Sequence, residues 1–357
     1  MKSMREIKIS PEGLVKRKRF FVATLVTCAA AAIIGGSLHV VELGSNRMAD
    51  MRDKAGYDLK DEAAHIRAAG EDIVLHRMHK GREIGNVSLS VMEVEAMLPE
   101  ATWTDLASFI DIPAGEFKMG TDRRQTDVQN TPEHVVTTAA YKISRYPVTN
   151  AQYAKFVAET GHRAPQHWDG GKTLPSQLLH PVTMVSWFDG RDYCQHQGGD
   201  VPTEAQWEKA ARGVDGRRWP WGDMMTTENL NTYYNVGSTT DVTRFKDGAS
   251  VYGVMDMAGN VSEWTRDEFL PYSGSDAPNE IFEAKMGVAT TPLDRALKVV
   301  ELVAVEAKYR VMRGGSWKSD PFSTATYHRN YSFPQYASDF YGFRCVVETS
   351  TQTSQKK

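Results

Sequence analysis

Two carboxylates flank a short turn that contains glycine and asparagine, and together they could bind a metal ion. Asp256 and Glu263 offer side-chain oxygens, while Gly259 and Val261 offer backbone carbonyls from the same short segment. Hard oxygen ligands drawn from one tight loop suit Ca²⁺. A turn with acidic neighbours more often binds no metal, so these residues alone leave both interpretations open.

Cysteine thiols are the second kind of side chain here that could do chemistry. The chain contains three cysteines, Cys28, Cys194 and Cys345, and the first lies in an apolar segment. If the other two lie outside the cytoplasm, they can oxidise to one bridge. That bridge would close a loop of about 150 residues and stabilise the fold by about 4–5 kcal/mol in the chain-entropy model. The alternative is a pair of buried free thiols.

Histidines give a weaker signal. His76 and His79 lie one turn apart on a predicted helix. A metal site would need a third ligand, and the sequence places none nearby. A solvated helix face is therefore the favoured interpretation.

An apolar segment over residues 20–41 contains no charged residue. About 20 apolar residues in a helix cross the hydrocarbon core of a bilayer. Residues 16–19 directly before it are all basic, whereas the next basic residue after it is Arg47. This asymmetry predicts a single transmembrane anchor, with residues 1–19 in the cytoplasm and the main mass outside. A cleaved signal peptide with a small-residue site at 35–37 is the alternative, but the apolar residues that follow favour retention.

Composition limits the remaining function classes. The net charge is −3, which gives no case for nucleic-acid binding. Charged residues make up 24% and aromatic residues 10%, as in an ordinary globular protein. The length beyond the anchor suffices for one large domain with a small extension.

Residues 42–104 are predicted to form a helical stalk that self-associates or docks on a membrane partner. Apolar residues recur there at three- and four-residue steps, from Met48 through Ile66. The pattern changes at Phe109, where short helices and strands predict an α+β domain. The expected strands are a hairpin over 109–120 and a strand over 141–150. Helices are expected over 151–159, from Ser186, from Thr203 and within 292–307. Gln206 completes a capping box with Thr203.

Eight motifs then occur in a fixed order: Pro113–Gly120, Tyr146–Asn150, His180–Trp187, Pro202–Glu208, Trp219–Gly222, Asp256–Trp264, Arg313–Trp317 and Gly342–Cys345. With these motifs the chain resembles the formylglycine-generating-enzyme, or sulfatase-modifying-factor, family, which includes ergothioneine-synthase and pyoverdine-maturation relatives. The resemblance implies an irregular, C-type-lectin-like α+β fold over residues 105–348, followed by a polar tail at 349–357. The stretch 270–308 is longer than usual for the family.

The resemblance also implies that the copper-binding cysteine pair has been lost. Formylglycine-generating enzymes bind copper through two active-site cysteines, and here Ser332 and Ala337 stand at those positions. A hydroxyl and a methyl cannot replace the soft thiolates that hold Cu(I). We therefore expect no copper and no formylglycine generation. An iron-dependent sulfoxide synthase is also disfavoured, because the histidine-bearing bundle of those relatives is missing.

Other site residues follow from the same resemblance. It implies a Cys194–Cys345 disulfide and structural calcium at Asp256, Gly259, Val261 and Glu263. It also implies a binding groove for a peptide or small substrate, lined by Arg313, Trp317, His328, Arg329 and Asn330. The alternative for Arg313 and Arg329 is that they tie loops together through buried carboxylates or carbonyls.

Two functions remain. The first is a non-catalytic, membrane-tethered module at the periplasmic face that binds or assembles an exported enzyme or a membrane complex. The second is an enzyme of altered chemistry, with His328, Tyr331 and Ser332 as candidate catalytic residues. A histidine of ordinary pKa can transfer protons near neutral pH.

Overall fold

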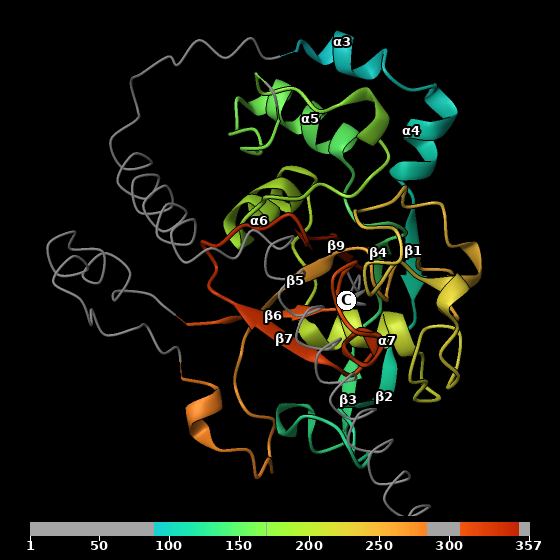
Figure 1. Ribbon diagram of the computed structural model, residues 1–357, viewed down its shortest axis with the longest axis vertical. Coiled ribbons are helices and arrows are strands. Elements are labelled where there is room, and N and C mark those ends of the chain that lie inside the picture. The colour runs from blue at the N-terminus through green and yellow to red at the C-terminus, as the bar shows by residue number, and fades with distance from the viewer. Residues whose placement is uncertain (1–88, 169, 284–307, 350–357) are drawn as a thin grey trace, which may run out of the picture. The chain divides into compact units, whose positions relative to one another are not determined.

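The computed structural model describes residues 89–168, 170–283 and 308–349 (Figure 1). The predicted anchor at 20–41, most of the predicted stalk and the predicted helix within 292–307 lie outside these ranges. Within them, no helix combines the length and the apolar character that crossing a membrane requires.

Short helices and strands are joined by long loops, which confirms a mixed helix-and-sheet fold. The α-helices are α3 (Val91–Glu95), α4 (Glu100–Leu106), α5 (Asn150–Thr160), α6 (Trp187–His196) and α7 (Glu204–Arg212). The strands are β1 (Phe109–Ile112), β2 (Gly115–Met119), β3 (His134–Thr138), β4 (Tyr141–Ser144), β5 (Ser262–Glu268), β6 (Arg310–Arg313), β7 (Arg329–Ser332), β8 (Tyr341–Gly342) and β9 (Val346–Glu348).

These strands form three small sheets in the part of the chain that is described. The first has the order β1-β4-β9, the second pairs β2 with β3, and the third has the order β7-β6-β5-β8. All pairings are antiparallel except that of β8 with β5. Strand β9, near the C-terminus, therefore pairs with a strand from the start of the domain.

The predicted hairpin over residues 109–120 is wrong. Two strands do flank Pro113, but β1 pairs with β4 and β2 pairs with β3. Alternating apolar residues mark strands, whereas strand partners are chosen by contacts distant in sequence. The local pattern therefore gave the strands and not their pairing.

The helix starts are confirmed. Thr149, Ser186 and Thr203 each cap a helix, and in each case the side chain three residues later returns a bond to the cap backbone. These capping boxes satisfy backbone N–H groups that have no partner within the helix.

The domain begins earlier than the predicted boundary at residue 105. Val94 on α3 is fully buried in the same core as Tyr153 and Phe156 of α5. Leu106 at the end of α4 is also buried. The end of the predicted stalk is therefore part of the domain.

Helix α7 lies between the sheets (Figure 1) and joins a second core that contains Trp207, Ile112 and Tyr141. The chain turns tightly past this helix at Gly314, whose φ is +89°. A Cβ on Gly314 would lie 3.0 Å from the Trp207 ring, so a larger residue would push the turn away from the helix.

Candidate functional site

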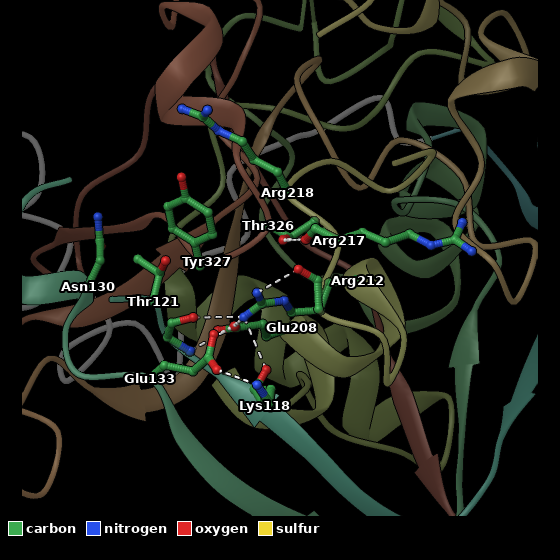
Figure 2. A network of polar contacts seen from close by, with 12 residues as sticks. Lys118, Thr121, Asn130, Glu133, Glu208, Arg212, Arg217, Arg218, Thr326 and Tyr327 are labelled. Atoms are coloured by element: carbon green, nitrogen blue, oxygen red, sulfur yellow. Dashed lines mark hydrogen bonds and ion pairs between the residues drawn. The ribbon is translucent and has the colours of Figure 1, made fainter. Parts of the chain in front are cut away.

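Helix α7 buries four charged side chains, which belong to Glu204, Glu208, Lys209 and Arg212. None is more than 4% exposed. Burying a charge without a partner is costly, so each must be compensated by nearby groups. The helix is thus the centre of an internal ion network, part of which is drawn in Figure 2.

Glu208 links three segments of the chain. Its carboxylate accepts hydrogen bonds from Arg212 at 2.7 Å and from the backbone N–H of Gly120 at 2.9 Å, and it pairs with Arg313. Arg212 in turn donates to the carbonyl oxygens of Lys118 at 3.0 Å and Gly120 at 2.8 Å (Figure 2). The pair therefore joins α7 to β2 and β6.

Glu204 makes the second half of the network. Arg329 donates to both of its oxygens, at 2.7 and 3.0 Å, and Arg313 donates to one at 3.2 Å. The guanidinium of Arg329 also stacks on Tyr272, 4.0 Å from the ring centroid. Arg313 is 0% and Arg329 2% exposed. Both arginines thus tie loops together, as the alternative interpretation has it, and neither faces a groove.

The remaining predicted groove residues are Trp317, Asn330 and His328, and each has its own polar neighbours. Trp317 is buried and donates from Nε1 to the carbonyl of Asp339 at 3.3 Å. The Asn330 side-chain oxygen accepts from the backbone of Tyr331 at 2.9 Å. His328 lies with Nδ1 3.6 Å from Asp127. Burial lowers the pKa of the His328 imidazole, which is therefore neutral at neutral pH.

The candidate catalytic residues diverge. Tyr331 and Ser332 are neighbours on β7, and His328 directly precedes it. Because side chains alternate along a strand, the neighbours Tyr331 and Ser332 lie on opposite faces of β7. Tyr331 stacks on Phe269, with ring centroids 4.2 Å apart. The structure therefore does not bring these residues together as an acid–base set.

The predicted calcium loop splits into two environments. Both oxygens of Glu263 are bonded to Arg344, at 2.6 and 2.7 Å, and one also accepts from Trp207 at 2.7 Å. Asp256 instead accepts from Asn260 at 2.8 Å. Burial raises the pKa of the Asp256 carboxyl to about 7. Glu263 is thus already neutralised by an arginine, whereas no cationic side chain among the described residues is bonded to Asp256.

The predicted disulfide is confirmed. Cys194 on α6 is bonded to Cys345, with a sequence separation of 151 residues. Both sulfur-bearing residues are buried in the core beside Trp264 and Phe343. The bridge joins the middle of the domain to its last strand.

Sequence reasoning missed the acidic and basic groups of α7 as site residues. Glu204, Glu208 and Arg212 recur at four-residue steps, so they share one helix face. That face looks like an exposed charge stripe unless the buried arginines of distant strands are known. Arg344 was also missed, because its partner Glu263 is distant in the sequence.

These features define a loop-rich α+β domain held together by buried ion pairs and one disulfide. The model of the sulfatase-modifying factor enzyme 1-like domain matches residues 94–349, and the chain belongs to this family. The formylglycine-generating enzyme of Mycobacterium tuberculosis is 29% identical over 310 residues, covering 68% of this chain and 98% of that protein.

Two further similarities extend the comparison. Serine/threonine-protein kinase Pkn1 of Chlamydia trachomatis is 30% identical over 273 residues, covering 72% of this chain but only 40% of the kinase. The chain thus spans less than half the length of that relative. The solved structure of PvdO from Pseudomonas aeruginosa has a TM-score of 0.51 and 26% identity, covering 68% of this chain and 94% of that one.

Proposed function

We propose that this chain is a membrane-anchored accessory module that binds or assembles a protein partner, and that it is not a copper oxidase. The cysteine inventory carries the proposal. Cys194 and Cys345 are joined in a disulfide, so of three cysteines only Cys28 is left. A Cu(I) site of the family type needs two thiolates, and Ser332 and Ala337 stand where the resemblance expects them.

The partner we propose is an exported enzyme or a membrane complex on the outer side of the plasma membrane. The anchor at 20–41 and the basic residues before it support this placement. The disulfide also supports an oxidising compartment such as the periplasm, because cytosolic thiols are kept reduced. A nucleic-acid partner is not expected at a net charge of −3.

We further propose one structural calcium ion at the Asp256 loop. A buried carboxylate whose pKa is raised to about 7 would be stabilised by a nearby cation. The buried side-chain oxygen of Asn231 also has no hydrogen-bond partner in the part of the chain that the structure describes. The Asn231 backbone carbonyl accepts from the N–H of Asn260, which belongs to the same loop as Asp256, at 2.8 Å. Asp256, with the carbonyls of Gly259 and Val261, would hold the ion. Glu263 fits less well, because Arg344 occupies both of its oxygens.

An enzyme of altered chemistry is the alternative that the test must detect. The observation in its favour is a neutral, largely buried imidazole at His328 with Asp127 3.6 Å away. Such a group is able to accept a proton. The similarity to a formylglycine-generating enzyme also supports testing this alternative.

The test uses the full chain purified in a nonionic detergent. Elemental analysis would give bound metals, and an oxygen electrode would follow oxygen uptake with thiol peptides and added copper. We expect calcium and no uptake. Bound copper or iron with turnover would overturn the accessory role. Affinity capture from membranes, with a chain lacking residues 1–41 as the matched control, would then identify the partner.

A further inference from the structure

A cavity of about 560 Å³ opens between the N-terminal helices α3 and α4 and the pair α5 and α6. It is separate from the ion network on α7, and none of the predicted groove, catalytic or calcium residues lines it. The volume lies in the range of small-ligand pockets. The described part of the chain therefore contains a hollow that the proposed function does not use.

The cavity is acidic. Three carboxylates line it, those of Glu95, Glu100 and Glu159, against one ammonium, that of Lys155. Lys155 pairs with Glu95 and lies 3.8 Å from Glu159, while His196 lies 2.9 Å from Glu159. Three carboxylates against the single ammonium of Lys155 leave two negative charges in excess. Glu100 has no ion-pair partner among the described residues.

Two aromatic side chains complete the wall. Trp103 lines the cavity, and its ring is held by a hydrogen bond of 3.0 Å from Nε1 to the carbonyl of Glu95. Tyr193 also lines it and is 5% exposed. The Tyr193 hydroxyl has no hydrogen-bond partner within the described ranges. Burial and the nearby Glu159 raise its pKa, so it remains a neutral donor and acceptor.

We propose that this cavity binds an organic cation, namely a guanidinium or ammonium group. The excess negative charge favours a cation, and the Trp103 ring offers it a π face. The free Glu100 carboxylate and the Tyr193 hydroxyl provide hydrogen-bond acceptors for its N–H groups. The same chemistry is found in a free small molecule and in the basic side chain of a peptide.

Isothermal titration calorimetry on the full chain in nonionic detergent tests the site. The probes are arginine amide and its neutral isostere citrulline amide, and a Gly-Ser-Arg-Ser-Gly peptide with its citrulline counterpart. We expect both arginine probes, or one of them, to bind at least tenfold more tightly than the matching citrulline probe. Binding of the amide alone identifies a small-molecule site, and binding of the peptide identifies a basic side chain.

Variants locate the binding. Glu100→Gln is on an exposed position and is not expected to alter folding. Glu100→Gln and Trp103→Leu should each weaken binding of the arginine probes about fivefold or more. Glu116→Gln, at an exposed position of strand β2, is the matched control and should leave binding unchanged. Equal affinity for arginine and citrulline probes, no binding of any probe, or full affinity in Glu100→Gln would overturn the proposal.

Discussion

Replacing Glu208 by glutamine should be among the most damaging single changes in the domain. Glu208 is 0% exposed and neutralises Arg212 and Arg313, which are themselves buried. Glutamine keeps the size of the side chain but removes its charge, so Arg212 would lose its carboxylate partner and Arg313 would have to share Glu204 with Arg329. Removing one partner from a buried ion pair typically costs about 3–5 kcal/mol. We expect Glu208→Gln to lower the free energy of unfolding by that amount.

Urea denaturation followed by circular dichroism measures the change, and two controls make it specific. Asp111→Asn removes the carboxylate of an exposed pair, in which Asp111 is 79% and Lys142 47% exposed, and it should cost about 1 kcal/mol or less. Adding Arg212→Met to Glu208→Gln removes the guanidinium that was left without a carboxylate and should recover about 1 kcal/mol or more. If Glu208→Gln costs no more than Asp111→Asn, the buried network does not stabilise the fold and the reasoning is wrong.

Three further predictions concern the bridge and two titrating groups. The double variant Cys194→Ser, Cys345→Ser should lose about 5 kcal/mol of stability, because the bridge closes a loop of 151 residues; urea midpoints with and without reductant check this, and an unchanged midpoint would contradict it. The pKa of His328 is lower in the folded state than in the unfolded state, so its contribution to stability is present above about pH 6.5 and is lost as pH falls. His328→Asn should therefore flatten the acid side of a plot of thermal midpoint against pH. A plot identical to that of the parent chain would count against this prediction. The pKa of Asp256 is raised to about 7, so with a chelator present the free energy of unfolding should fall on the order of 4 kcal/mol as pH rises from about 4 to 7. Added Ca²⁺ should remove this pH dependence, and Asp256→Asn should abolish it. A calcium response that persists in the variant would rule out Asp256 as a ligand.

Features encoded by neighbouring residues were predictable from the sequence. The cap at Thr203 and its partner Gln206 are three residues apart, so the start of α7 needed no knowledge of the remainder of the fold. The Cys194–Cys345 bridge was open to residue counting, and the family motifs selected it over free thiols.

Long-range pairing was not predictable in the same way. Glu204 meets Arg313 across 109 residues and Arg329 across 125. From the sequence alone, an arginine in such a motif looks like a ligand-binding group, because charged side chains are normally exposed. Only the position of α7 between the sheets shows that these arginines face inward. Arg313 and Arg329 were therefore predicted to line a groove, whereas the structure places both in a buried ion network.

The order of strands has a consequence for biosynthesis. Strand β4 accepts β9 as a neighbour, and Arg344, one residue before Cys345, neutralises Glu263 in the interior. Nascent chains emerge from the ribosome N-terminus first, so neither the β1-β4-β9 sheet nor the Glu263 pair can close until residues 344–348 have been made. Up to that moment the domain lacks its final strand and carries an uncompensated internal carboxylate. A chain truncated before residue 344 would lack both the last strand of this sheet and the arginine that neutralises Glu263, and we expect it to stay open to proteolysis.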